Sequence, residues 1–340
     1  MSPGCRCKFQ GLTLGLYTLT MNRLFTWSFL WSEARYNLKQ NQFKKGSQFL
    51  AAAWLTLWSI FLSAHPSTGI ALDSKGNVYF SDLEHIWKHS ASGTTQVFVK
   101  NVHSHHFKLS PGGQLVGEHS EIDSVTGAFI RRFWQASVTG ERTDVSRQEA
   151  TAVLGIPFAG EWYWPESDLH RKKVEFSRFQ GEELEVNFTL ELGNTDDELT
   201  SAKLGVFGGW AVQNDGTSLL AAGGLAKRIN KNGQVESLFS GHFKYNDEHY
   251  SELSSVALGE NGAAYWTHLD RRAVYISTDA KNIRELYKSG FWWKPAGVAE
   301  YSNHVYILES SRNPFSNAVR VIKLKDGGEV DVIAHNTSVN

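Results

Sequence analysis

The sequence STGIALDSKGNVYFSD at Ser67–Asp82 consists of two short apolar runs joined by a turn that contains a glycine. Isoleucine, valine and aromatic residues favour strands, and Gly76 permits the positive φ angle that a tight hairpin turn requires. We therefore predict a β-hairpin whose second strand ends at Asp82. Because the chain repeats this pattern, the hairpin indicates how the rest of the sequence is organised.

The pattern recurs in six units at intervals of roughly forty to fifty residues, and each unit continues into a second pair of predicted strands. Four-stranded units of this length are typical of β-propeller blades, which must stack to bury both of their faces. We therefore predict an all-β, six-bladed β-propeller of four-stranded antiparallel blades. The predicted propeller covers residues 65–335, with blades at about 65–99, 103–146, 153–190, 206–240, 252–288 and 294–334.

Two other architectures fit part of the pattern: a pair of β-sandwiches, and a seven-unit ring that uses part of the N-terminal leader. The third unit, around Glu161–Glu166, has the weakest turn chemistry. The last unit supplies its own fourth strand near Ile333, without a strand from the N-terminus. No long amphipathic helical pattern interrupts the series, which argues against an α/β fold.

Residues 1–64 form a predicted leader that differs from the repeats. Lys44 and Lys45 precede the apolar run 49–62, and the small residues Ser63 and Ala64 follow it. This arrangement is typical of a secretory signal peptide, although an uncleaved membrane anchor has the same appearance. We therefore predict an extracytoplasmic protein, secreted or periplasmic, that contacts a membrane only if the N-terminal segment stays uncleaved.

The composition excludes several classes of function. The 34 basic and 35 acidic residues give a net charge of -1, which argues against nucleic-acid binding because that requires a basic face. Both cysteines, Cys5 and Cys7, lie in the leader, so the propeller has neither a disulfide framework nor a thiol nucleophile. The partners that remain are a small-molecule or glycan ligand or another protein.

Ser67–Asp82 resembles an NHL repeat, and Glu84–Lys88 together with Ser92–Gly93 resembles the second half of that repeat. From His65 to Ala334 the chain resembles the superfamily of six-bladed NHL, gluconolactonase and regucalcin-like propellers. The resemblance implies the fold. It implies no single activity, because these propellers include binding scaffolds, lactonases and lyases.

In such a blade the start of the innermost strand and the end of the second strand emerge on the same face, around the axial channel. Carboxylates there suit Ca²⁺ or Mg²⁺, and added imidazoles suit Zn²⁺, which polarises a carbonyl or activates a water. The alternative is that each acid accepts hydrogen bonds from the loops of its own blade. The candidate ligand-binding residues of this funnel are His65, Asp82, His105, Glu118, His119, Glu166, Glu252, His268 and Glu309.

Histidines cluster before the inner strand of the second unit, at His103, His105 and His106. The chain resembles peptidyl-amidoglycolate lyases, NHL propellers in which histidines at the starts of inner strands hold a metal. The resemblance implies His65 and His105 as metal ligands, and we add Glu118. The later units lack a third matching histidine, unless His249 or His268 is placed differently. Gluconolactonases use a Glu, two Asn and an Asp that this sequence does not reproduce.

Two hypotheses for the function follow. The first is a metal-dependent hydrolase or lyase that acts on a small polar substrate in the axial funnel. The second is a non-catalytic module that binds a ligand, a glycan or a protein on the same face. An aromatic platform for a sugar or another flat apolar face is one interpretation of Phe291–Lys294, Trp162 and Trp164, and packing between blades is the alternative for these side chains.

Overall fold

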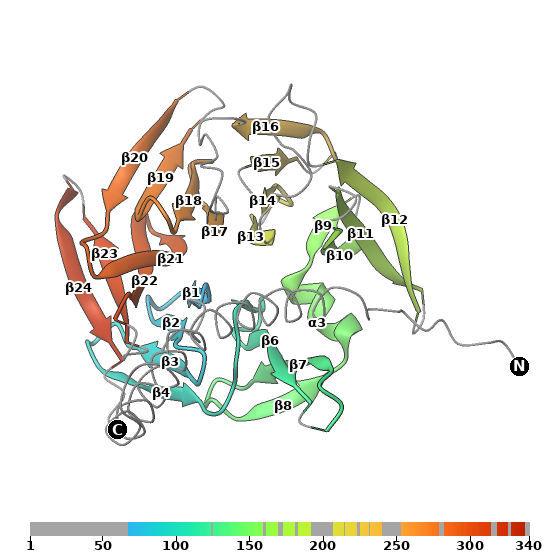
Figure 1. Ribbon diagram of the computed structural model, residues 1–340, viewed down its shortest axis with the longest axis horizontal. Coiled ribbons are helices and arrows are strands. Elements are labelled where there is room, and N and C mark those ends of the chain that lie inside the picture. The colour runs from blue at the N-terminus through green and yellow to red at the C-terminus, as the bar shows by residue number, and fades with distance from the viewer. Residues whose placement is uncertain are drawn as a thin grey trace, which may run out of the picture. The chain divides into compact units, whose positions relative to one another are not determined.

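The computed structural model contains six four-stranded antiparallel sheets arranged as a ring, which we call blades 1 to 6 in chain order. Figure 1 shows the first strand of each blade near the centre of the ring and the last strand at its rim. The predicted all-β six-bladed propeller is therefore confirmed. The described residues are 67–336 except for 124, 159–160, 169–172, 181–182, 192–206, 214, 223–224, 231, 240–252, 279–281, 314–317 and 326–327.

Each blade is built from four consecutive strands, and strands that are neighbours in sequence are neighbours in the sheet. Blades 1 to 3 comprise β1 Ile70–Leu72, β2 Val78–Ser81, β3 Ile86–His89, β4 Thr95–Val99, β5 Phe107–Leu109, β6 Leu115–Ile122, β7 Phe129–Ala136, β8 Arg142–Val145, β9 Ile156–Phe158, β10 Glu161–Asp168, β11 Lys173–Gln180 and β12 Glu183–Glu191. Blades 4 to 6 comprise β13 Phe207–Val212, β14 Ser218–Ala222, β15 Leu225–Ile229, β16 Val235–Phe239, β17 Leu253–Leu258, β18 Ala264–His268, β19 Ala273–Ser277, β20 Ile283–Lys288, β21 Trp293–Tyr301, β22 His304–Ser311, β23 Val319–Leu324 and β24 Val330–His335.

The hairpin that begins blade 1 has the predicted register and turn. Ile70 pairs with Phe80, and Gly76 has a φ angle of +77°, which a residue with a Cβ rarely adopts. The carboxylate of Asp73 accepts hydrogen bonds from the backbone amide of Asn77 at 2.9 Å and from its side chain at 2.7 Å. Burial raises the pKa of Asp73, and these hydrogen bonds outweigh it and lower the pKa on balance.

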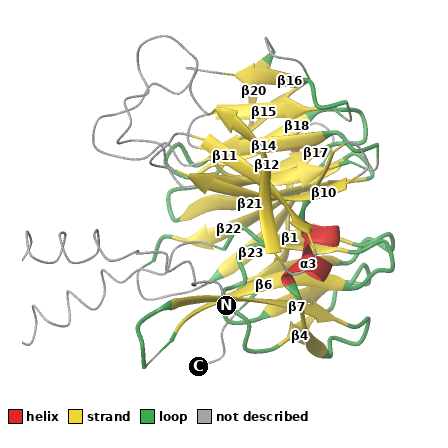
Figure 2. Ribbon diagram, turned by 90° about the vertical axis from the view of Figure 1, so that its right-hand side faces the viewer, coloured by secondary structure: helices red, strands yellow, loops and turns green. Residues whose placement is uncertain are grey.

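One short helix, α3 (Arg147–Leu154), connects blade 2 to blade 3. It starts with a capping box in which Ser146 Oγ accepts from the backbone of Glu149, and the Glu149 carboxylate accepts from the backbone of Ser146. The helix contacts β5, β6, β7 and β10, and Figures 1 and 2 show it between the two blades. Among the described residues, no helix is long and apolar enough to cross a membrane.

The apolar core is divided into clusters that lie between neighbouring blades. Tyr79 and Phe107 belong to the cluster that joins blades 1 and 2, and Trp266 belongs to the one that joins blades 4 and 5. Leu154 of α3 belongs to the cluster shared by blades 2, 3 and 4, which also contains the buried Trp164. Each blade is therefore stabilised by burying apolar side chains against its neighbours.

Blade 1 and blade 6 close the ring without exchanging a strand. Ile70 and Phe80 of blade 1 pack with Tyr306 and Leu308 of blade 6 in one apolar cluster. The strands approach closely at Gly297, where a Cβ would lie 2.6 Å from the backbone oxygen of Thr68. Only glycine fits a backbone approach of this kind.

A polar clasp between Asp82 and Asn336 adds to this closure. Asn336 Nδ2 donates to Asp82 Oδ2 at 2.8 Å, and Asn336 Oδ1 accepts from the backbone amide of Val319 at 2.6 Å. Both side chains are buried, with Asp82 9% and Asn336 1% exposed. One side chain at the end of the last blade therefore ties that blade to the end of the first hairpin.

We expect Asn336→Ala to lower the free energy of unfolding by about 1–3 kcal/mol, because it leaves a buried carboxylate oxygen and a buried amide short of a partner. Urea denaturation of the full chain measures this loss. The matched control is Asn232→Ala, at an exposed position in blade 4. Equal stability of the two variants would show that the clasp contributes nothing to ring closure.

Candidate functional site

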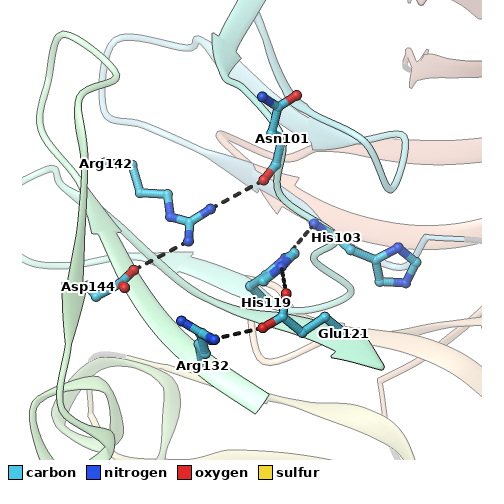
Figure 3. A network of polar contacts seen from close by, with 7 residues as sticks. All are labelled: Asn101, His103, His119, Glu121, Arg132, Arg142 and Asp144. Atoms are coloured by element: carbon cyan, nitrogen blue, oxygen red, sulfur yellow. Dashed lines mark hydrogen bonds and ion pairs between the residues drawn. The ribbon is translucent and has the colours of Figure 1, made fainter. Parts of the chain in front are cut away.

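Residues 101–106, which we call the histidine loop, precede the innermost strand of blade 2. The end of β6 holds the backbone of this loop in place. The backbone amide of His103 donates to His119 Nδ1 at 2.9 Å (Figure 3), and the amide of Glu118 donates to the carbonyl of His106 at 3.2 Å. The loop is thus ordered by contacts that do not involve the side chains of His103 and His106.

Two further contacts fix the loop from the sides. Arg142 of β8 donates to the carbonyl of Asn101 at 3.3 Å, and its other terminal nitrogen donates to Asp144 at 3.3 Å (Figure 3). Thr68 Oγ1, just before β1, donates to the carbonyl of His105 at 2.6 Å. Blade 1 and the outer edge of blade 2 therefore both hold the histidine loop.

His119, a candidate ligand from the sequence, supports the loop through both of its ring nitrogens. Its Nδ1 accepts from the His103 amide, so the ring proton lies on Nε2, which is 3.4 Å from Glu121 Oε2. Arg132 Nε is 3.0 Å from the other oxygen of Glu121, which completes the chain of contacts in Figure 3. His119 therefore positions His103.

The side chains of His103 and His105 meet each other. Their Nε2 atoms are 3.1 Å apart, and the two rings form an edge-to-face pair with centroids 5.0 Å apart. At this distance one Nε2–H donates to the other Nε2. Because the backbone amide of His103 also donates to His119, three of the histidines of blade 2 are linked through a single loop.

Glu118 points to the other side of blade 2, because consecutive residues of a strand face opposite ways. Val116, two residues before it on β6, packs in the core cluster that contains α3. The Glu118 carboxylate lies 3.3 Å from Arg131 Nε of β7. The structure therefore separates Glu118 from the pair formed by His103 and His105.

A second polar group, which we call the α3-facing cluster, comprises His106, Lys108, Glu118, Arg131 and Trp210. The ring of His106 lies 4.4 Å from that of Trp210, and Lys108 Nζ lies 5.6 Å from the Trp210 ring centroid. Lys108 Nζ and Trp210 Nε1 both donate to the carbonyl of Leu154, at 3.2 and 2.5 Å. A cation at the C-terminus of a helix is stabilised by the helix dipole.

The titratable groups of the α3-facing cluster have displaced pKa values. Burial lowers the pKa of His106 to about 3, with Lys108 and Arg131 adding to the effect, so this imidazole is neutral at ordinary pH. Burial also lowers the pKa of Lys108 to about 7. It raises the pKa of Glu118, while Arg131 opposes that rise. Groups of this kind gather at functional sites more often than elsewhere.

His106 Nε2 is buried and, among the residues that the structure describes, has no hydrogen-bond partner. Buried polar atoms are nearly always paired in native proteins, with protein groups or with water. The missing partner therefore indicates that a water or a ligand atom completes the cluster at this point.

Two other candidate residues, Glu309 and His268, are buried and form hydrogen bonds within the fold. Glu309 is fully buried, accepts from Tyr287 at 3.0 Å and lies 2.6 Å from Arg320 Nε. Burial and the nearby Glu309 raise the pKa of Tyr287 to about 12. His268 is also buried, its Nδ1 accepts from the backbone of Arg271 at 3.3 Å, and burial lowers its pKa to about 4.

Asp82 is also buried and forms hydrogen bonds within the fold. Besides Asn336, its carboxylate accepts from Trp87 Nε1 at 2.6 Å and from the backbone amides of Glu84 and His85 at 2.9 and 2.7 Å. These contacts match the alternative in which the acid that ends the second strand accepts hydrogen bonds from the loops of its own blade. Asp82 lies apart from the histidine loop in the contacts that the structure describes.

The remaining candidates are not placed in a common site. His65 and Glu252 lie outside the described residues, and Glu166 is in β10 opposite Glu175, with its side chain outside the described part. In the described part of the chain, no three His, Cys, Asp or Glu side chains lie close enough to hold one metal ion. A divalent cation with His65 and His105 as ligands stays a prediction, and the third predicted ligand, Glu118, lies on the opposite side of blade 2 from the pair formed by His103 and His105.

The aromatic residues divide between the surface and the core. Phe291 and Trp292 are 61% and 63% exposed and contact each other edge to face at 5.1 Å. Trp164 is buried in the core between blades, as its alternative interpretation predicts. Trp293 packs under Arg320 at 4.1 Å. The exposed pair Phe291 and Trp292 lies in the turn before β21, while Trp162, which is 40% exposed, lies in β10 of blade 3.

Lys108, Arg131 and Trp210 are functional candidates that the sequence did not predict. Lys108 alternates with two apolar residues in β5, a pattern that normally places a lysine in solvent. The signal that was available is the capping box of α3, Ser146 followed by Glu149 three residues later. A helix predicted from this signal between blades 2 and 3 would have indicated that this part of β5 is covered and not exposed to solvent.

The sequence matches no family model and no curated protein. Solved structures that resemble the chain include virginiamycin B lyase from Staphylococcus aureus, with 12% identity, a TM-score of 0.45, and coverage of 78% of this chain and 83% of that one. The PQQ-bound aldose sugar dehydrogenase from Streptomyces coelicolor has 12% identity, a TM-score of 0.43, and coverage of 79% and 94%. A gluconolactonase from Xanthomonas campestris has 12% identity, a TM-score of 0.33, and coverage of 79% and 76%. Similarity at this level says nothing about the reaction.

Lys108 is expected to make stability depend on pH. Its pKa is about 7 when folded and ordinarily 10.5, so the unfolded chain binds more protons between these values and stability rises with pH across that window. At about 1.4 kcal/mol per pKa unit, the wild type should gain a few kcal/mol relative to Lys108→Met from pH 7 to pH 10.

Urea denaturation at several pH values measures this difference. Lys75→Met, at an exposed turn, is the control for the loss of one positive charge. If the stability difference between wild type and Lys108→Met is constant from pH 7 to pH 10, then the ammonium group of Lys108 is not destabilised by burial.

Proposed function

We propose that this propeller is a hydrolase or lyase that acts on a small polar substrate at the α3-facing cluster. The observation that carries the proposal is the buried, unpartnered Nε2 of His106 beside an amine whose pKa is about 7. A substrate oxygen is the kind of group that would complete this arrangement. The support comes from the geometry of the cluster and from its displaced pKa values.

The residues of the cluster suit acid–base chemistry on a carbonyl compound. Neutral His106 would hydrogen-bond the carbonyl oxygen without needing to lose or gain a proton. Lys108 has the pKa nearest to ordinary pH, so in its neutral form it would take a proton from water or from the carbon next to the carbonyl. Glu118, whose pKa is raised, would return a proton to the leaving oxygen.

The proposal also includes the export and the divalent cation that the sequence predicts. Export is supported by the apolar run 49–62 with its preceding lysines and its small-residue end. For the cation, the described residues do not assemble the three predicted ligands, so no step of the chemistry is assigned to it here.

A binding module is the second candidate, and the exposed pair Phe291 and Trp292 favours it. Arg312 lies 5.0 Å and Arg272 lies 5.8 Å from the Phe291 ring, and Arg312 also donates to the Phe291 carbonyl at 3.1 Å. Exposed aromatic faces held in this way are suited to stacking on a sugar ring. The partner in this case is a glycan or a protein that displays one.

We expect the full chain to hydrolyse or cleave at least one member of a panel of lactones and aryl esters. His106→Gln should lower kcat/KM by about 100-fold or more, because acid–base and positioning groups contribute at this level. His304→Gln, at the first residue of β22, is the matched control and should keep the wild-type rate.

The pH profile separates catalysis from simple binding. The rate should rise with a midpoint near pH 7 as Lys108 loses its proton, and this rise should be absent in Lys108→Met. No turnover of any panel member, together with saccharide binding that is lost in Trp292→Ala, would refute the enzyme and support the binding module.

A further inference from the structure

The two Nε2 atoms of His103 and His105 have the separation of two ligands on one metal ion. Zinc–nitrogen bonds are about 2.0–2.1 Å long, so two nitrogens at a tetrahedral angle lie about 3.3 Å apart. The observed distance is 3.1 Å. We propose that His103 and His105 form a two-histidine site for a divalent transition metal ion.

Binding requires only a local rearrangement of protons. In the hydrogen-bonded pair one Nε2 carries a hydrogen, so that ring must shift its proton to Nδ1 before both nitrogens can donate lone pairs to the ion. The ion then replaces the shared hydrogen, and neither ring has to rotate far.

The loop is prepared for this role by its backbone contacts. The His103 amide is held by His119, whose other nitrogen contacts Glu121, and Figure 3 shows His119 between the backbone of His103 and Glu121. The His105 carbonyl is held by Thr68. Ligands fixed by surrounding hydrogen bonds lose less entropy on binding and bind metal more tightly.

The chemistry of the pair selects the class of ion. Two neutral imidazoles favour Cu²⁺, Ni²⁺ and Zn²⁺, whereas Ca²⁺ and Mg²⁺ prefer oxygen ligands. The two imidazoles fill two of the positions around the ion. This site differs from the ligand set that the resemblance and Glu118 suggested, because it uses His103 and leaves Glu118 on the α3 side of the blade.

The test is a titration of the full chain with Cu²⁺, carried out in a Cys5→Ser, Cys7→Ser background because the Cys-x-Cys pair of the leader also binds soft metals. Calorimetry should give one ion per chain at this site. His103→Ala and His105→Ala should each weaken binding by more than about tenfold, while His304→Ala, in which a histidine outside the loop is lost, should bind as the parent does.

Electron paramagnetic resonance of the unmutated loop provides a second measurement that does not depend on the folding of a variant. The spectrum should show coupling to the nitrogens of two imidazoles. Binding that survives both alanine variants, or coupling to fewer than two imidazole nitrogens, would overturn the proposal. Because the readout is metal binding, the result is independent of whether the α3-facing cluster catalyses a reaction.

Discussion

Every blade has two apolar faces, and each is covered only when the neighbouring blade is in place. The interblade clusters show this constraint directly, since none of them is confined to a single sheet. Five of the six junctions join blades that are adjacent in sequence. The sixth joins blade 6 to blade 1, and there Asp82 and Asn336 add a polar clasp to the apolar contacts.

The same constraint explains why charged groups are buried in blade 2. Its face toward blade 3 packs partly on α3, and the carbonyl of Leu154 at the end of that helix requires donors. Lys108 and Trp210 provide them, which places an ammonium group where burial works against its charge. The displaced pKa values of the α3-facing cluster are therefore a consequence of how the helix is fitted between blades.

The sequence predicted the strands well because hairpins are local: alternation and a glycine turn, as at Gly76, are visible within a dozen residues. It placed His105, Glu118 and His119 at one end of one blade, but their partners depend on side-chain direction and on neighbouring elements. Separating Glu118 from the two histidines required the register of β6 with β5 and β7. The partner of Asp82 lies 254 residues away, beyond the reach of any local pattern.

The clasp also sets an order of events during synthesis. Blade 1 can pack on blade 2 early, but its other face, with Ile70 and Phe80, has no cover until blade 6 and Asn336 have been made. At about 5–20 residues per second, the 254 residues from the one after Asp82 up to Asn336 take roughly ten to fifty seconds to synthesise. During that interval the nascent protein presents an uncovered apolar sheet face, so the period of greatest exposure to aggregation is fixed by the position of its final blade.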